Sequence, residues 1–166
     1  MAIHKLSILI PAFNEEKTIE LILEKVRSVH LENIEKEVVV VNDCSSDATV
    51  DRINDYISKF PDFNLKLFSQ THNQGKGAAI NRAIQECSGD YLIIQDADLE
   101  YDPNEYELLL KPVLHADADV VYGSRFVGHH PHRILFFWHS IGNKFLTRLS
   151  NMMTNLNLTD METCYK

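Results

Sequence analysis

The sequence lacks the features of a membrane-spanning or secreted protein. No stretch of the 166 residues approaches the roughly 18 consecutive apolar residues needed to span a bilayer, and Met1 to Lys5 contain no signal-peptide apolar run. The three cysteines, Cys44, Cys87 and Cys164, have neither the even number of a disulfide framework nor the spacing of a zinc site. These absences predict a protein of the reducing cytoplasm in which nothing crosses a membrane.

Positive charge is also scarce. The chain has 16 Lys and Arg against 24 Asp and Glu, which gives a net charge of −8. Nucleic-acid backbones are held by clustered cations, so this composition excludes a general nucleic-acid surface and requires any anionic ligand to be met by local cations. With 45% hydrophobic residues and no repeat or low-complexity linker, we expect one domain, residues 1–166, with an ordinary core.

Two glycine-rich phosphate-binding motifs are missing. No Gly-x-Gly-x-x-Gly follows the first apolar run, and no Gly-x-x-x-x-Gly-Lys-Ser/Thr occurs anywhere in the chain. The absence of both motifs excludes dinucleotide-dependent dehydrogenases and P-loop nucleotide hydrolases.

Short apolar runs alternate with amphipathic helical patterns along the first 125 residues. The runs predict strands at 6–10, 37–41, 65–69, 90–94 and 120–123. Helices are expected between them, the first with Asn14 as its N-cap and Glu15 and Glu16 in its first turn. Alternation of this kind predicts an α/β fold, a doubly wound and mainly parallel sheet with helices on both faces.

Three carboxylates follow the strand predicted at 90–94. Asp96, Asp98 and Glu100 occupy alternate positions, so on extended backbone their side chains would face one way. Hard oxygen ligands without Cys or His suit Mg²⁺ or Mn²⁺, and ligands of open α/β sheets collect outside the carboxyl ends of the strands. We therefore predict a divalent metal site there, able to hold a diphosphate.

Two further strand ends carry residues suited to a nucleoside. Phe13 follows the first strand and offers a stacking face, while Asp43 follows the second and can accept a hydrogen bond from a base N–H. Each alone is more often an ordinary core or capping residue. At neighbouring strand ends they predict a nucleoside pocket.

These motifs together resemble the inverting family 2 glycosyltransferases of the GT-A fold. The resemblance is carried by Pro11-Ala12-Phe13-Asn14-Glu15-Glu16, Asn42-Asp43-Cys44-Ser45-Ser46-Asp47 and Gln95-Asp96-Ala97-Asp98. Gly75-Lys76-Gly77-Ala78-Ala79, Asp98-Leu99-Glu100-Tyr101-Asp102-Pro103 and Gly123-Ser124-Arg125-Phe126 narrow it to a branch similar to dolichyl or polyprenyl phosphate sugar synthases. It implies a Rossmann-like nucleotide-sugar-binding half at 1–100 and an acceptor-side part with a helix at 101–166, which is expected to be incomplete.

The resemblance also implies roles for individual residues. Donor binding is expected from Pro11, Ala12, Phe13, Glu15, Asp43, Lys76, Asp96 and Ala97, and metal binding from Asp96, Asp98 and Glu100. Catalysis is expected from Asp98, Arg125 and Arg133, and acceptor binding from Arg125, Arg133, Ser140 and Asn143. Glu100 departs from the Gln often found at its position in mannosyl-phosphate synthases, which leaves the donor sugar open.

The expected reaction moves a sugar from a UDP-glucose-like donor or GDP-mannose to a polyprenyl or dolichyl phosphate, with inversion. A phosphate acceptor is largely dianionic at pH 7 and needs no strong base. Two alternatives stay open. One is transfer to a polysaccharide hydroxyl, which would require a base such as Asp160 within reach, and the other is a non-catalytic nucleotide-sugar-binding domain.

The last quarter of the chain has a different character. Apolar and aromatic residues at helical spacing over 134–153 predict a helix whose apolar face is core or a subunit contact in a homo-oligomer, with contact to the cytoplasmic face of a membrane as the second choice. His129, His130 and His132 are not expected to bind metal, because adjacent side chains point apart and Pro131 fixes the backbone between them. The pattern stops abruptly at Lys166, which predicts a truncated chain.

Overall fold

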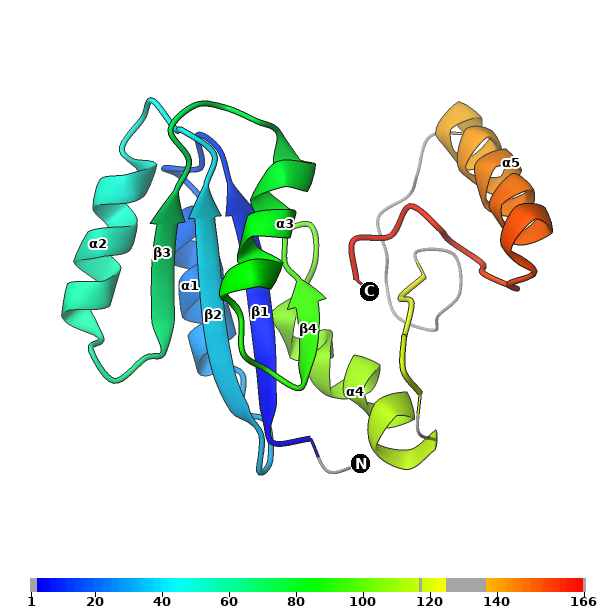
Figure 1. Ribbon diagram of the computed structural model, residues 1–166, viewed down its shortest axis with the longest axis horizontal. Coiled ribbons are helices and arrows are strands. Elements are labelled where there is room, and N and C mark those ends of the chain that lie inside the picture. Colours follow the sequence, from blue (N-terminus) through cyan, green and yellow to red (C-terminus); the bar gives the residue numbers. More distant parts are fainter. Residues whose placement is uncertain (1–2, 117, 125–136, 166) are drawn as a thin grey trace.

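The computed structural model describes residues 3–116, 118–124 and 137–165, and it is built around a four-stranded sheet (Figure 1). All neighbouring strands pair in parallel, in the order β3-β2-β1-β4. The strands are β1 (Lys5–Ala12), β2 (Glu35–Asn42), β3 (Leu65–Ser69) and β4 (Tyr91–Ile94). The chain steps outward from β1 to β3 and then returns to the other side of β1, so the strand order reverses between β1 and β4. This switch point is where open α/β sheets bind ligands.

Helices alternate with the strands as predicted. They are α1 (Ile19–Ser28), α2 (Thr49–Lys59), α3 (Lys76–Glu86), the 3₁₀ helix η1 (Pro103–Glu105), α4 (Tyr106–Ala116) and α5 (Phe137–Thr154). The helix α3 lies on one face of the sheet, whereas α1, α2 and α4 pack on the other (Figure 1). The α/β class and the placement of helices on both faces are therefore confirmed.

The continuous apolar runs of the strands explain this layering. In β2, Val38 and Val40 pack into the core under α1 and α2, while Val39 and Val41 face Ala79 and Ala83 of α3. Successive side chains of a strand point to opposite faces, so a stretch that is covered on both sides is apolar at consecutive positions, as in Val38 to Val41. Small alanines on α3 allow that helix to approach the sheet closely.

The predicted start of the first helix is wrong. The helix α1 begins at Ile19, and Asn14 has φ 57°, in the left-handed region, instead of capping the helix. Its side-chain oxygen accepts a hydrogen bond from the backbone N–H of Ser46 at 2.9 Å. A contact with the neighbouring loop has thus replaced the local capping contact that the sequence suggested.

The fifth strand expected at 120–123 is also wrong. This stretch is irregular, and Val120 is 66% exposed. The N–H of Gly123 donates to the carbonyl of Tyr165 at 2.9 Å, but Tyr165 lies in an irregular segment, so the contact does not extend into a ladder. Strand propensity in a short run does not make a strand without a neighbour in register.

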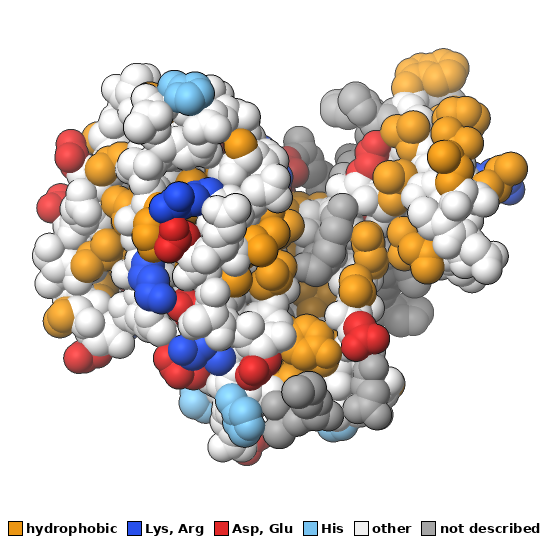
Figure 2. Space-filling model, in the orientation of Figure 1, with side chains coloured by type: hydrophobic (Ala, Val, Ile, Leu, Met, Phe, Trp, Pro, Cys, Tyr) orange, Lys and Arg blue, Asp and Glu red, His pale blue; other side chains and the backbone are white. Residues whose placement is uncertain are grey.

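The helix α5 has its apolar face turned outward. Asn143 and Thr147 are buried, whereas Phe145, Met152 and Met153 are 66, 78 and 80% exposed, and orange side chains line this helix in Figure 2. The prediction that this face forms core is therefore wrong for these residues. No helix in the described part of the chain is both long and apolar enough to cross a membrane.

Candidate functional site

A cavity of about 320 Å³ opens at the carboxyl edge of the sheet, at the switch point between β1 and β4. It brings together every residue for which donor binding was predicted, together with Asp98. The side chains and backbone that line it belong to Pro11, Ala12, Phe13, Glu15, Asp43, Asn73, Gly75, Lys76, Ala79, Asp96, Ala97 and Asp98.

Strand register explains why residues so far apart in sequence meet here. Ala12 pairs with Asn42, so the chains leaving β1 and β2 diverge from the same level, and the N–H of Asp43 donates to the carbonyl of Ala12 at 2.8 Å. On the other side, Leu9 pairs with Ile94, which places the turn after β4 beside the end of β1. Parallel strands in register deliver their following loops to one edge of the sheet.

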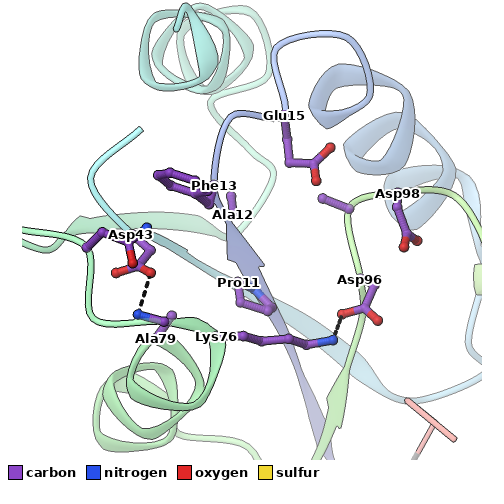
Figure 3. Close-up of a pocket in the computed structure, with 12 residues that line it drawn as sticks. Pro11, Ala12, Phe13, Glu15, Asp43, Lys76, Ala79, Asp96 and Asp98 are labelled. Carbon is purple, nitrogen blue, oxygen red and sulfur yellow. Dashed lines mark hydrogen bonds and ion pairs between the residues drawn. The ribbon is translucent and has the colours of Figure 1, made fainter. Parts of the chain in front are cut away.

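The side of the cavity formed by the β1 and β2 loops suits a nucleoside. Phe13 is 47% exposed, so its ring is not core, and Figure 3 shows it on the same side as Asp43. Asp43 is buried, and its two carboxylate oxygens accept hydrogen bonds from the N–H groups of Gln74 and Gly75, each at 2.8 Å. Asp43 therefore holds the loop before α3 while it also lines the cavity, and a carboxylate oxygen that has accepted one hydrogen bond can accept another.

The loop held by Asp43 ends at Gly75, where α3 begins. Gly75 has φ 86°, in the left-handed region that residues with a Cβ rarely adopt. The first turn of α3 then lines the cavity through Lys76 and Ala79. A helix N-terminus presents unpaired N–H groups and a partial positive charge, both of which favour an anionic group such as a phosphate.

The other side of the cavity is ionic. Lys76 Nζ lies 2.5 Å from Asp96 Oδ1, and Figure 3 shows Asp98 beside this pair. Partial burial acts to lower the pKa of Lys76, but the hydrogen bond and charge of Asp96 outweigh it, with Asp98 adding, so the pKa is raised. The ammonium group therefore stays charged and is available to a diphosphate in the cavity.

The three carboxylates do not share one extended face. The strand β4 ends at Ile94, the chain turns at Ala97 and Asp98, and Leu99 has φ 63°. Asp96 and Asp98 line the cavity, but Glu100 does not, and its N–H donates to Asp98 Oδ1 at 3.0 Å. The prediction that all three carboxylates face one way is therefore wrong, because it required extended backbone beyond β4.

The cavity nevertheless has donors that suit a divalent ion. Among the described residues, no group of three or more His, Cys, Asp or Glu side chains is arranged to hold a metal. Mg²⁺ is commonly bound by one or two carboxylates together with substrate phosphates, and Asp96 and Asp98 provide that number at the edge of the cavity. The donor set fits an ion that arrives with a diphosphate, and it does not fit a closed protein cage.

Two of the four residues predicted for the acceptor, Ser140 and Asn143, belong to the described structure. Arg125 and Arg133 are outside the described residues, and Ser140 and Asn143 lie on α5 without lining the cavity. Asn143 is buried, where it donates to Asp160 Oδ1 at 3.2 Å and accepts from Thr147 Oγ1 at 3.1 Å. In the described structure Asn143 ties α5 to the following segment.

Sequence reasoning missed Asn73, Gly75 and Ala79 as lining residues. A signal for the first two was present, because both lie in the polar stretch between the third strand and the next helix, where an α/β sheet places its binding loops. Ala79 could not be distinguished from an ordinary core alanine, since it also packs against β1 and β2.

The family model for glycosyl transferase family 2 matches residues 7–164, which is most of the chain. The chain belongs to glycosyltransferase family 2. The match covers the loops that form the cavity as well as α5 and the segment that follows it.

The curated relatives reported next are also named as sugar transferases. The chain is 32% identical over 123 residues to dolichol-phosphate mannosyltransferase of Pyrococcus furiosus, covering 74% of this chain and 34% of that protein. It is 32% identical over 129 residues to dolichyl-phosphate beta-glucosyltransferase of Dictyostelium discoideum, covering 72% and 39%. The chain thus spans between a third and two fifths of the length of these relatives.

Solved GT-A glycosyltransferases share the fold. The mannosyltransferase PcManGT from Pyrobaculum calidifontis, solved in complex with GDP-Man and Mn²⁺, superposes with a TM-score of 0.56 at 30% identity, covering 59% of this chain and 28% of that one. TarS of S. aureus, in complex with UDP-GlcNAc, gives a TM-score of 0.51 at 34% identity, covering 57% and 26%. One of these two structural neighbours thus has a guanine nucleotide bound and the other a uracil nucleotide.

Proposed function

We propose that this chain carries the donor site of an inverting glycosyltransferase that moves a sugar from a nucleoside diphosphate sugar to a polyprenyl or dolichyl phosphate. The observation that carries the proposal is the cavity with two chemically different sides, one aromatic and one ionic. Support comes from the relatives named as dolichyl-phosphate sugar transferases and from the GT-A neighbours that contain nucleotide sugars.

The two sides of the cavity fit the two ends of the donor. The base would stack on the exposed ring of Phe13, with Asp43 accepting from a base N–H. The diphosphate would lie at the first turn of α3, where Lys76 can leave Asp96 and meet a phosphate oxygen. Glu15 lines the same cavity, although its side chain also accepts from Thr18 Oγ1, so it is suited to position the loop as much as to bind.

Asp96 and Asp98 would hold Mg²⁺ or Mn²⁺, which neutralises charge that develops on the departing diphosphate. The two carboxylates would also orient the diphosphate relative to the sugar. The negative charge of Asp96 is balanced by Lys76 in this structure, and it would be balanced by the metal ion if Lys76 turned to a phosphate oxygen.

The chemical step would be a single displacement. An oxygen of the acceptor phosphate attacks the anomeric carbon, the bond from that carbon to the diphosphate breaks, and the nucleoside diphosphate leaves with the bonding electron pair. One displacement inverts the anomeric centre. Arg125 and Arg133, which lie outside the described residues, are proposed to bind the acceptor phosphate through their planar, bidentate guanidinium groups.

The exposed surface of α5 favours a lipid acceptor over a soluble one. Its exposed apolar side chains include Phe145, Met152 and Met153, and the sequence of Phe137–Thr154 contains Lys144 and Arg148 but no Asp or Glu. In a chain with net charge −8, an acid-free amphipathic helix suits a membrane surface with anionic headgroups. We propose that α5 lies against the membrane that carries the polyprenyl phosphate.

Calorimetry with UDP and GDP, each with and without Mn²⁺, tests the donor site. We expect one nucleotide to bind in a Mn²⁺-dependent manner and its nucleoside to bind more weakly. Binding must then be followed by sugar transfer from the matching nucleotide sugar to polyprenyl phosphate in vesicles. Transfer to a glycan hydroxyl instead would favour the polysaccharide alternative, and binding without any transfer would favour a nucleotide-sugar-binding domain.

Flotation with vesicles tests the surface of α5. Phe145→Ser and Met152→Ser should reduce recovery with anionic vesicles, whereas Leu21→Ser should not, because Leu21 is a 55% exposed apolar residue on the distant α1. Equal recovery of all variants contradicts the membrane proposal. Concentration-dependent self-association lost in the same α5 variants would point to a subunit contact instead.

A further inference from the structure

A fully buried glutamine lies directly behind the ionic side of the cavity. Gln95 follows β4, is 0% exposed, and its backbone N–H donates to the carbonyl of Leu9 in β1 at 2.9 Å. The Nε2 group donates to the carbonyls of Asp96 and Tyr101, at 3.0 and 3.3 Å. The Oε1 atom accepts from the hydroxyls of Tyr106 and Tyr165, at 2.7 and 2.9 Å.

These four contacts use the whole hydrogen-bonding capacity of the amide. A glutamine side chain has two N–H donors and an oxygen with two lone pairs, and all four are matched here by protein atoms. The two carbonyls fix which end is nitrogen, because only an NH₂ group can donate to both. No other natural side chain of this size offers two donors and one doubly accepting oxygen in the same plane.

The amide closes the loop that carries the site carboxylates. Its two donated hydrogen bonds join the carbonyl at the start of the loop, Asp96, to the carbonyl at its end, Tyr101. Between them the backbone passes through Leu99 at φ 63°, a conformation that a leucine adopts only where its surroundings impose it. Asp98 lies inside the closed loop, so its position at the cavity depends on this closure.

We propose that Gln95 is a positioning residue for the donor site, which holds the Asp96–Tyr101 loop so that Asp96 and Asp98 meet the metal and diphosphate of the donor. The inference rests on the proposed function for the identity of the ligand. It goes further by assigning the geometry of the carboxylates to a residue that does not line the cavity. Partners that orient metal ligands from outside typically change metal affinity about 10- to 100-fold when removed.

The same network makes the C-terminal segment part of the donor site. Tyr165 is buried, its ring lies 4.8 Å from the ring of Tyr101, and the N–H of Cys164 donates to the Tyr101 hydroxyl at 3.1 Å. The carboxylate loop is thus held between α4, which begins with Tyr106, and the C-terminal segment, where Tyr165 comes 70 positions after Gln95. Residues 164 and 165 therefore support donor binding without touching the donor.

Gln95→Met tests the proposal, because methionine keeps the shape and volume but cannot make the four hydrogen bonds. We expect Mn²⁺-dependent nucleoside diphosphate affinity to fall about tenfold or more, with nucleoside affinity near the parental value. Glu37→Gln is the matched control, since it alters an equally buried polar network distant from the cavity. Glu37→Gln should lower the stability of the fold, but it should not lower nucleoside diphosphate affinity relative to nucleoside affinity.

Tyr165→Phe gives a milder second variant in case Gln95→Met fails to fold. Tyr165→Phe removes one of the four hydrogen bonds, so diphosphate affinity should again fall more than nucleoside affinity, but by less than in Gln95→Met. Ser7→Ala removes one hydroxyl beside Glu37 and should leave the ratio of the two affinities unchanged. Parental diphosphate affinity in both Gln95→Met and Tyr165→Phe overturns the proposal. An equal fall in nucleoside and diphosphate affinity also overturns it, because it indicates a general loss of structure.

Hydrogen exchange without ligand separates this inference from the proposed function. Gln95→Met should raise the exchange rate of amides in residues 96–101 while leaving those of β1 and β2 protected. If the parental chain binds neither UDP nor GDP, the proposed function fails, and unchanged exchange in the loop would independently refute the role of Gln95 in holding it. Faster exchange confined to the loop supports that role whatever the ligand is.

Discussion

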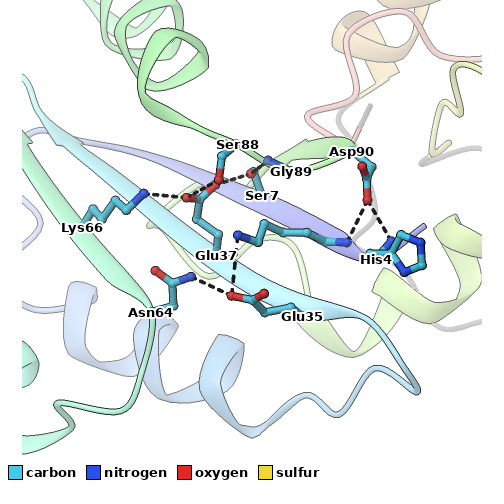
Figure 4. Close-up of polar contacts among 10 residues, drawn as sticks. His4, Ser7, Glu35, Glu37, Asn64, Lys66, Ser88, Gly89 and Asp90 are labelled. Carbon is cyan, nitrogen blue, oxygen red and sulfur yellow. Dashed lines mark hydrogen bonds and ion pairs between the residues drawn. The ribbon is translucent and has the colours of Figure 1, made fainter. Parts of the chain in front are cut away.

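One buried carboxylate, Glu37, and a pair of carboxylates, Asp96 and Asp98, lie toward opposite ends of the same sheet, and they differ in their hydrogen-bond partners. Glu37, near the start of β2, is enclosed by Ser7, Lys66 and Ser88, as Figure 4 shows. Its oxygens accept from Ser7 Oγ at 2.6 Å, Lys66 Nζ at 2.7 Å, and Ser88 N and Oγ at 2.7 and 3.0 Å. Asp96 and Asp98 at the other end line an open cavity.

The comparison shows that a carboxylate can stabilise the fold at one end of the sheet and be suited to bind a ligand at the other. Burial alone would raise the pKa of Glu37, but the hydrogen bonds from Lys66, Ser7 and Ser88 outweigh it and hold the pKa at about 2. Every partner is supplied by the protein, so the ionised form stabilises the fold. The cavity carboxylates instead line an open cavity, where Asp96 pairs with the 55% exposed side chain of Lys76, and a metal ion and a diphosphate can enter there.

Close packing keeps the Glu37 network closed. The N–H of Gly89 donates to Ser7 Oγ at 2.9 Å, and a Cβ at Gly89 would lie 2.6 Å from that oxygen and 2.7 Å from the backbone nitrogen of Ser7. A backbone atom cannot move aside as a flexible side chain can, so only glycine fits. The loop before β4 is therefore fixed against β1, in contrast to the loop after β4, which turns into the cavity.

The largest effect should come from opening the Glu37 network. Glu37→Ala leaves the hydroxyls and N–H around it without their acceptor, and we expect the free energy of unfolding to fall by about 3–4 kcal/mol. Urea unfolding followed by circular dichroism measures the loss. The folded fraction should bind nucleoside diphosphate with parental affinity. A specific loss of binding would contradict the view that Glu37 serves only the fold.

Lowering the pH should remove the stabilisation that the Glu37 network provides. The pKa of Glu37 is depressed to about 2 in the folded state, so its contribution is complete above the ordinary carboxyl pKa near 4.5 and is lost as the pH falls toward 2. The contribution amounts to about 3 kcal/mol. Unfolding free energies measured from pH 6 to pH 2 should fall more steeply in the parental chain than in Glu37→Gln. Parallel curves would contradict the assignment.

At the cavity, Asp98→Asn should reduce Mn²⁺-dependent nucleoside diphosphate affinity about 100-fold, or about 2.7 kcal/mol. Asparagine retains an oxygen that can accept from the N–H of Glu100, so the turn is kept and only the charge is removed. Calorimetry measures the affinity and thermal unfolding checks the fold. Unchanged stability is expected, since removing one carboxylate also relieves repulsion with Asp96.

The smallest effect is expected for Asp43→Asn, which keeps one acceptor oxygen for the loop before α3 but loses the other. Nucleoside affinity should fall about tenfold, or about 1.4 kcal/mol, and binding of Mn²⁺ with pyrophosphate should change little. Competition calorimetry with nucleoside and pyrophosphate separates the two. Equal loss of both ligands would show that Asp43 acts by holding the loop alone.

The sequence by itself determined the four strands of the sheet, their parallel arrangement and the placement of Phe13, Asp43, Asp96 and Asp98 at one edge, whereas the other predicted cavity residues came from the resemblance to a known family. Continuous apolar runs such as Val38 to Val41 can be satisfied only by a sheet covered on both faces, and parallel strands deliver their loops to one edge. The positions of Phe13, Asp43 and Asp98 after three such strands therefore suffice to predict that these residues lie together. This part was predictable because it depends on periodicity and on local turn chemistry.

Tertiary contacts decided what local patterns could not. Asn14 left its capping role because Ser46 lies beside it, and the carboxylates after β4 turned because Gln95 closes their loop with tyrosines from α4 and from residue 165. The helix α5 turned its polar Asn143 inward because Asp160 offers a buried partner. In each case the deciding partner lies between 11 and 70 positions away in sequence, and only folding brings it within hydrogen-bonding distance.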